Sequence, residues 1–220
     1  MHLKWLLAGA YRLRTGLLCC VCWSISTAGE PTNPAQEIKP PRLEVPAKWR
    51  TEDTTYPPPW ARQLPWKGSL QLRFPPGFFQ KQDPYFWSYP IFYWLRGDVL
   101  ADRADLQRAL RAYDAGLYGK QFKADQIKID IGADRMVRVG HQAMVYRRVT
   151  FQGFDPFVTK RPLTTYLETY RWYCPDSKHT AVLILRSARR PDPQDSVWKR
   201  LLRFRPSVPC PDARGVDPPP

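Results

Sequence analysis

Residues 102–119 read DRADLQRALRAYDAGLYG and carry the clearest periodicity in the chain. Asp102 is placed to cap the start of a helix, and Gly116 or Gly119 is placed to end it. The opposite face of this helix, which includes Asp114, is expected to be solvated. Apolar residues recur at the spacing of one helix face, which predicts a buried stripe of Leu106, Ala109, Leu110, Tyr113 and Leu117.

On both sides of this helix the sequence favours β-strands. Residues 86–95 are the most aromatic stretch, and after the helix Ile127, Ile129 and Ile131 alternate with polar residues, which is the period of a half-buried strand. The predicted strands are residues 69–74, 86–95 as one strand or two short ones, 127–131, 136–151 as one long strand or a pair broken near Gly140, 163–174 and 180–187. Pro90 lacks an amide donor and is expected to confine its strand to an edge or a bulge.

A second, short helix is predicted over about residues 193–203, with Asp192 as its cap. Its inward-facing residues are expected to be Val197, Trp198, Leu201 and Leu202. One long helix combined with successive antiparallel strands predicts an α+β fold. We expect a curved antiparallel sheet of about five to six strands packed on the long helix, plus the short C-terminal helix.

The N-terminus resembles an export signal in its order of residues. Basic residues precede a short apolar run at 16–25, and the small residues Ser26, Thr27 and Ala28 offer a peptidase site. The apolar run is shorter than the about 20 residues that span a bilayer. Residues 1–28 are therefore predicted to be a cleavable signal peptide, and the protein to be periplasmic or extracellular. The alternative is an uncleaved N-terminal membrane anchor.

Composition divides the rest of the chain. Residues 29–66 are rich in proline and are predicted to be a linker of polyproline II character, although their tryptophans indicate that the second half lies along the domain. Residues 67–210 form the predicted globular domain, and 211–220 a disordered tail. Removal of the signal leaves two of the five cysteines, Cys174 and Cys210. One pair in an exported domain predicts one disulfide, with two free buried thiols as the alternative.

Motifs of catalysis are missing from the sequence. It contains no Gly-x-Ser-x-Gly elbow, no His-Glu-x-x-His and no glycine-rich phosphate loop. No cofactor is expected, and no metal site, because two cysteines at this spacing do not supply the ligands of a zinc site. The catalytic candidates are His141 and Glu168. A small hydrolase or isomerase that uses one of them is the alternative to a non-catalytic domain.

The strand predicted over 163–174 has an unusual face, which reads Tyr166, Glu168, Tyr170 and Trp172. A carboxylate among three aromatic side chains is costly to bury alone, so it is expected to pair with Arg147, Arg148 or Arg186. This predicts a pocket with a charged floor and aromatic walls that binds a small ligand or a sugar. The alternative is an exposed sheet face with a cross-strand ion pair.

The C-terminal part of the domain is strongly basic, in a chain whose formal net charge is +14. The basic residues singled out for binding are Arg186, Arg189, Arg190, Lys199, Arg200 and Arg203, which face only Asp192 and Asp195 in that stretch. A positive field of this kind attracts polyanions. In an exported protein the expected partners are anionic lipid, lipopolysaccharide or acidic glycan, or an envelope protein, and not nucleic acid. The alternative is a solvated helix in an arginine-rich proteome.

One loop carries a second surface hypothesis. Phe154 and Phe157 lie in the predicted loop 152–162, beside Lys160 and Arg161. Aromatic residues next to cations suit peripheral contact with a membrane surface, and the alternative is that the phenylalanines pack on the core. Together these features predict an exported, non-catalytic domain that binds an anionic envelope component or a partner protein.

Overall fold

The computed structural model describes residues 40–139, 142–204 and 210, all within one unit, Ile38–Pro220. The predicted signal peptide, the predicted tail and His141 lie outside the described residues. The strands are β1 Arg50–Tyr56, β2 Gly68–Phe74, β3 Tyr89–Arg96, β4 Lys128–Ile131, β5 Arg135–Val139, β6 Gln142–Phe154, β7 Pro162–Cys174 and β8 His179–Ser187. The helices are α1 Arg103–Tyr118 and α2 Ser196–Leu201, with short 3₁₀ helices η1 Pro59–Ala61 and η2 Ala124–Gln126.

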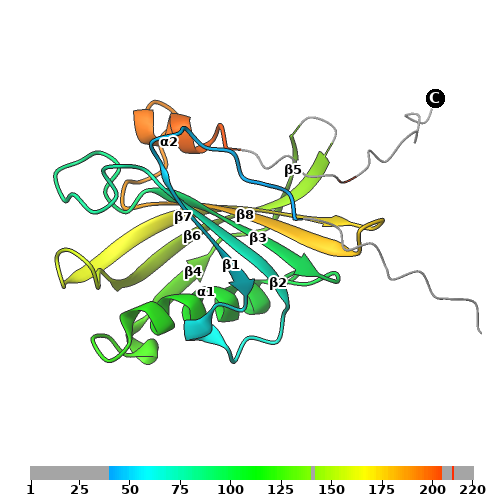
Figure 1. Ribbon diagram of the computed structural model, residues 1–220, viewed down its shortest axis with the longest axis horizontal. Helices are drawn as coiled ribbons and strands as arrows, with labels where there is room; N and C mark the ends of the chain where they lie inside the picture. Colours follow the sequence, from blue (N-terminus) through cyan, green and yellow to red (C-terminus); the bar gives the residue numbers. More distant parts are fainter. Residues whose placement is uncertain (1–39, 140–141, 205–209, 211–220) are drawn as a thin grey trace, which may run out of the picture. The chain divides into compact units, whose positions relative to one another are not determined.

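The strands form one antiparallel sheet in the order β1-β2-β3-β8-β7-β6-β4, and β5 also pairs with β6. The central pair joins β3 to β8, so that Tyr89 lies opposite Arg186. Helix α1 lies on one side of this sheet and α2 on the other (Figure 1). An antiparallel sheet combined with helices confirms the predicted α+β class.

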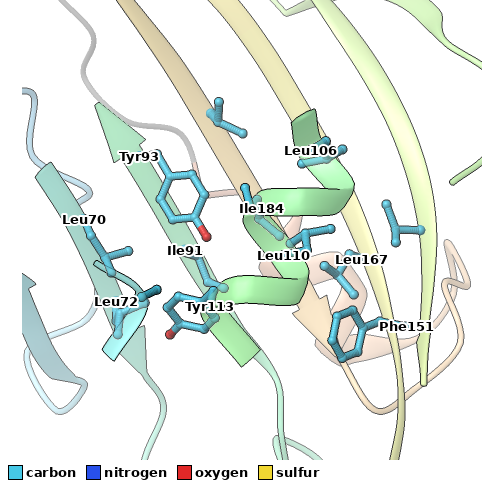
Figure 2. Packing of buried hydrophobic residues seen from close by; sticks show 14 of the residues in the cluster. Leu70, Leu72, Ile91, Tyr93, Leu106, Leu110, Tyr113, Phe151, Leu167 and Ile184 are labelled. Carbon is cyan, nitrogen blue, oxygen red and sulfur yellow. The ribbon is translucent and has the colours of Figure 1, made fainter. Parts of the chain in front are cut away.

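Helix α1 begins and ends where the sequence predicts. The Asp105 amide donates to the Asp102 carboxylate at 2.7 Å, and the Gly119 amide donates to the Ala115 carbonyl. Its apolar stripe is buried against one face of the sheet (Figure 2). The stripe of Leu106, Ala109, Leu110 and Tyr113 packs in one cluster with Leu70, Ile91, Tyr93, Leu167 and Ile184 of the strands.

The other face of the sheet is covered by α2. Val197, Trp198 and Leu201 are buried there, in a cluster with Phe92, Trp94, Trp172, Leu183 and Leu185. The helix starts later than predicted, because the Asp195 carboxylate accepts from the Val197 and Trp198 amides at 2.9 and 3.1 Å. Asp192 instead accepts from the Gln194 amide, in the turn before the helix. Leu202 is not an inward-facing residue, since 36% of it is exposed.

The sheet has eight strands, so the predicted number of five to six is wrong. One difference is β1, which lies inside the range assigned to the proline-rich linker. It reads RTEDTTY and has no apolar alternation, because it is an edge strand that packs little of its surface. Of the two predictions for residues 136–151, the pair of strands is confirmed, because β5 and β6 are separate strands that pair with each other.

The segment before β1 is also fixed to the sheet. Gln71 and Arg73 of β2 are buried, and both bind the backbone of this segment. The Leu43 amide donates to Gln71 Oε1 at 2.9 Å, and Arg73 Nε donates to the Leu43 carbonyl at 2.9 Å. Leu43 and Trp49 then pack in the cluster beneath α2. The tryptophan signal in the proline-rich stretch thus reflects residues that contact the domain.

Pro90 lies in a central strand, not at an edge or bulge as predicted. It pairs with Leu185 of β8, on one side of β3. On the other side of β3, the last pair of the ladder with β2 joins Leu72 to Ile91, so the ladder does not extend to Pro90. The missing amide donor is tolerated because no β2 residue pairs with this position.

Candidate functional site

Glu168 is the centre of a small polar cluster on the α2 side of the sheet. It is 6% exposed, and its two carboxylate oxygens accept from different tyrosines. Tyr146 donates to Oε1 at 3.1 Å, and Tyr170 donates to Oε2 at 2.9 Å. Arg148 stands directly opposite on β6, with its Nε 3.6 Å from Oε1 and 2.7 Å from the Tyr146 hydroxyl. Every carboxylate oxygen is therefore satisfied.

The cluster brings Glu168 together with Tyr170 of the same strand and Tyr146 of β6, and the ligand pocket expected on this face stays a prediction. Burial, together with the neighbouring charge of Glu168, raises the pKa of Tyr146, so this hydroxyl stays protonated and able to donate. The Arg148 side chain is 64% exposed, so the cluster opens to solvent through its cation. Trp172, by contrast, is 3% exposed and packs in the core beneath α2.

Arg186 does not reach this cluster, although it was a predicted partner and binding residue. It is 1% exposed and lies on the α1 side of the sheet. Its guanidinium donates to both oxygens of Asp114 at 2.8 and 3.0 Å and to Thr165 at 3.0 Å. It also lies over the ring of Phe151, 4.7 Å from the centroid. Arg186 is therefore a core residue that external ligands do not reach.

Asp114 corrects the predicted solvated face of α1, because it is fully buried. Besides Arg186 it accepts a hydrogen bond from Tyr118 at 2.9 Å. Burial raises the pKa of Asp114 despite the opposing charge of Arg186, and the charge of Asp114 in turn raises the pKa of Arg186. Sequence spacing places Asp114 beside the buried stripe, but only the tertiary partner on β8 explains its burial.

Arg147 is likewise an internal residue rather than a binding residue. It is 1% exposed and holds Asp134 through two hydrogen bonds, at 2.9 and 2.7 Å. Hydrogen bonds from Arg147 lower the pKa of Asp134. Since residues alternate along a strand, Arg147 and Arg148 leave β6 on opposite faces. Of the three predicted partners of Glu168, the structure brings only Arg148 to it.

The remaining basic candidates gather around α2. Arg189 is paired with Asp195 at 2.5 Å, and its carbonyl accepts from the Trp198 indole at 2.9 Å, which ties this segment to the helix. The other four form what we call the α2 basic surface: Arg190, Lys199, Arg200 and Arg203. All four are exposed, and among the described residues none is in an ion pair.

Aromatic rings support two of these cations. Arg190 donates to the Tyr166 hydroxyl at 3.0 Å and lies 5.6 Å from that ring, and Arg200 lies 6.0 Å from the ring of Tyr85. Tyr85 was not singled out from the sequence. Its position in the long β2–β3 connection brings it next to Trp49, at 6.2 Å between centroids.

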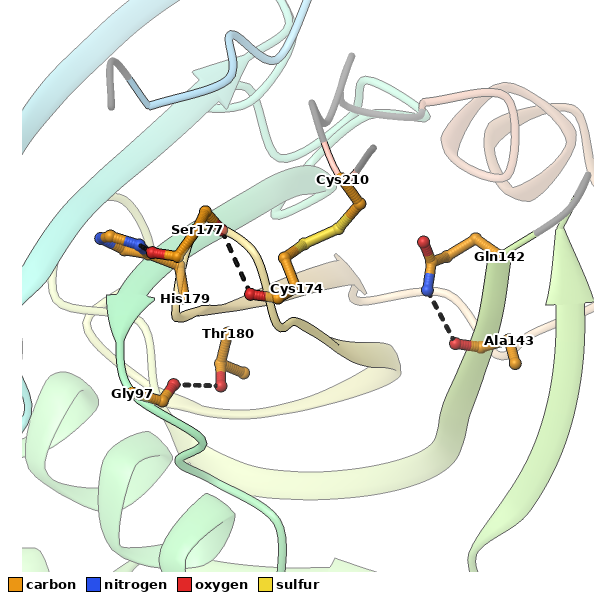
Figure 3. The surroundings of a disulfide bond; sticks show 8 residues. All are labelled: Gly97, Gln142, Ala143, Cys174, Ser177, His179, Thr180 and Cys210. Atoms are coloured by element: carbon orange, nitrogen blue, oxygen red, sulfur yellow. Dashed lines mark hydrogen bonds between the residues drawn. A yellow bond between two sulfur atoms is a disulfide. The ribbon is translucent and has the colours of Figure 1, made fainter. Parts of the chain in front are cut away.

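The predicted disulfide partners lie side by side (Figure 3). Cys174 ends β7 and is fully buried, and its Cα is 5.3 Å from that of Cys210, a disulfide distance. His179 stands nearby, its ring stacked on Trp94 at 4.9 Å and its Nδ1 2.5 Å from the Ser177 carbonyl. These contacts give His179 a structural role at the start of β8.

Comparisons with protein-family models, curated protein sequences and solved structures find no match to this chain. Within the described ranges, no group of three or more His, Cys, Asp or Glu side chains is arranged to hold a metal ion. No helix in the described part of the chain is long and apolar enough to cross a membrane. The function is therefore inferred from the side chains themselves.

The two phenylalanines of the β6–β7 connection behave differently. Phe154 ends β6 and stacks on Phe122 at 5.4 Å, so it belongs to the core, as the alternative prediction had it. Phe157 is 44% exposed. It contacts Phe79, at 5.8 Å between centroids, a residue that sequence reasoning did not select. The consecutive aromatics Phe78 and Phe79 after a Pro-Pro-Gly turn are the signal that marks this connection.

Proposed function

We propose that this protein is an exported, non-catalytic domain whose α2 basic surface binds an anionic component of the cell envelope. The observation that carries the proposal is the gathering of four exposed cations around one short helix, outside any ion pair in the described part of the chain. Cations that are not neutralised within the protein are available to phosphate or carboxylate groups of a ligand.

The Glu168 cluster supports binding rather than catalysis. Both carboxylate oxygens already accept from tyrosine hydroxyls, and the nearest cation is Arg148. A carboxylate held in this way orients Tyr146 and Tyr170 on the sheet surface, where the rings offer flat apolar contact to a ligand. We assign specificity to this face and the main attraction to the α2 basic surface.

The test is a binding measurement with two charge variants of the full chain. Lys199→Gln/Arg203→Gln removes two cations of the α2 basic surface. Arg62→Gln/Lys67→Gln is the matched control, because it removes one arginine and one lysine that are exposed near η1, the element packed on α1. A cation near an anionic surface contributes about 1 kcal/mol, so the first variant should bind about 30-fold more weakly.

The ligands are phosphatidylglycerol vesicles and an acidic polysaccharide, each at low and high salt. Attraction should fall steeply between about 0.1 M and 1 M salt, because the screening length shrinks from about 10 to 3 Å. Salt-sensitive binding to either ligand that the α2 variant alone weakens supports the proposal. Absence of binding to both, or binding that the control variant weakens equally, overturns it.

The proposal includes a disulfide between Cys174 and Cys210 and a cleaved signal peptide at residues 1–28. The 36-residue separation makes such a bond worth about 4 kcal/mol in the chain-entropy model. Intact-mass measurement of the protein from its native compartment tests both parts. A mass that includes residues 1–28 refutes the cleavage, and two additional protons refute the bond.

A further inference from the structure

Exposed apolar side chains gather at one end of the sheet, where two connections meet. The β2–β3 connection, residues 75–88, and the β6–β7 connection, residues 155–161, touch through Phe79 and Phe157. Phe79 is 43% exposed, Phe157 44% and Val158 37%. These three residues, which we call the aromatic tip, are most of the large hydrophobic side chains exposed in the described part of the chain.

The β6–β7 connection is organised by one buried carboxylate. Asp155 is fully buried, and it accepts from the Phe157 and Val158 amides at 3.0 and 3.1 Å and from the Thr159 amide at 2.6 Å. Burial alone would raise the pKa of Asp155, but the hydrogen bonds from Thr159, Val158 and Phe157 bring it below its ordinary value of 3.8. The turn therefore presents Phe157 and Val158 outward in a fixed geometry.

The β2–β3 connection is equally well defined. Its backbone is held by successive turn hydrogen bonds, from Phe78 to Ser88. Gly77 is required because a Cβ there would lie 1.9 Å from the Asp83 carboxylate, which itself accepts from the Tyr85 amide at 2.7 Å. Phe79 is therefore exposed by a folded loop, and its ring packs edge-on against Phe78 at 4.7 Å.

The tip is positively charged around its apolar centre. An open groove of about 540 Å³ runs between the two connections, lined by Phe79 and Val158 and by the cations Lys81 and Arg161. Both cations are exposed. The carboxylates of Asp83 and Asp155 accept from backbone amides of their own loops, and neither is in an ion pair with Lys81 or Arg161 in the described part of the chain.

The connection that carries Phe79 also contacts the α2 basic surface. Tyr85, in the same connection as Phe79, lies beneath the guanidinium of Arg200. The β2–β3 connection, the β6–β7 connection and α2 lie at one end of the sheet (Figure 1). Apolar side chains at a loop apex, bordered by cations on two sides, match the layered chemistry of an anionic bilayer, with phosphates outside and acyl chains beneath.

We infer that the aromatic tip is a membrane-insertion site: Phe79, Phe157 and Val158 enter the interfacial layer of an anionic lipid bilayer, while Lys81 and Arg161 meet headgroup phosphates. This inference rests on the proposed function and narrows its ligand to a lipid surface. Insertion adds an apolar contribution that persists when salt screens the cations.

The test uses the full chain on phosphatidylcholine–phosphatidylglycerol vesicles and on lipid monolayers whose surface pressure reports insertion. Phe79→Ala/Phe157→Ala should abolish the pressure rise and weaken vesicle binding at least about tenfold, since each ring is about half available for burial. Met136→Ala is the control, because Met136 is 69% exposed on β5 and should leave both readouts unchanged.

A third variant keeps the inference testable if the double variant Phe79→Ala/Phe157→Ala does not fold. Val158→Ser leaves the ring contacts in place and keeps the amide that binds Asp155, and it should reduce the pressure rise without changing the melting temperature. A pressure rise that survives in both tip variants overturns the inference. Salt-sensitive binding to acidic polysaccharide without binding to vesicles also overturns it, but leaves the proposed function standing. Loss of binding to both ligands removes both.

Discussion

The buried pair of Asp114 and Arg186 allows a quantitative prediction. Replacing Asp114 by leucine leaves the Arg186 guanidinium in the core, where both groups are at most 1% exposed. It also removes the acceptor of the Tyr118 hydroxyl. Loss of one member of a buried ion pair costs about 3–5 kcal/mol, because the remaining charge is uncompensated. A typical domain is stable by about 5–15 kcal/mol, so this loss is a fifth or more of its stability.

The two single variants should differ from each other. Arg186 cannot release its proton, whereas Asp114 can take one up, and burial already raises its pKa. Arg186→Met should therefore cost less free energy of unfolding than Asp114→Leu, and its deficit should shrink as the pH falls. The double variant Asp114→Leu/Arg186→Met should lie within about 1–2 kcal/mol of the wild type or above it, because two apolar groups replace the pair.

Urea unfolding followed by circular dichroism measures these differences, with the denaturant slope as a check that the unfolded state is unchanged. The expected coupling between the two sites is about 3 kcal/mol. The reasoning is refuted if Asp114→Leu costs under about 1 kcal/mol, or if the double variant is as unstable as Asp114→Leu. Either result would mean that the unpaired guanidinium of Arg186 is not what destabilises Asp114→Leu.

Three further predictions concern smaller features. Glu168→Ala should cost about 1–3 kcal/mol of unfolding free energy, because it removes the acceptor of the Tyr146 hydroxyl, and a smaller loss in urea unfolding would mean that water replaces the carboxylate. Gly77→Ala should cost about 1–3 kcal/mol through collision with Asp83, and adding Asp83→Ala should recover part of that loss in the melting temperature. The pKa of Asp155 is lowered in the folded state, so its contribution to the free energy of unfolding is complete above the ordinary pKa of 3.8 and is lost as the pH falls below that value. Asp155→Asn should lack this part of the acid dependence of stability, which a series of unfolding curves at different pH values measures.

The main elements of the fold could be predicted because their signals are local. The period of α1, its Asp102 cap, the polar and aromatic face of β7 and the apolar run of β8 are visible in single windows of sequence. Strand β1 could not be predicted in the same way. As an edge strand it buries little, so its Arg50–Tyr56 sequence lacks alternation, and its pairing with β2 is set by tertiary contact.

The candidate site was only partly predictable, because a charge does not reveal its partner. Glu168 stood out as a carboxylate among aromatics. The structure satisfies it with Tyr170 of that same face and with Tyr146 of β6, which the pattern did not include. Arg147 and Arg186 looked equivalent to Arg148, yet they point to the opposite face. Phe79 was missed since its exposure depends on how two distant loops meet.

The order of strands has a consequence for when the chain can fold. The central ladder pairs β3 with β8, so Tyr89 must wait for a partner that leaves the ribosome about 100 residues later, and such non-local pairings slow folding. Until β8 is synthesised, the three strands β1–β3 lack the strand that pairs with β3, and α1 has no complete sheet face to cover. The complete sheet can therefore form only when synthesis is nearly finished, a delay that suits the export proposed above.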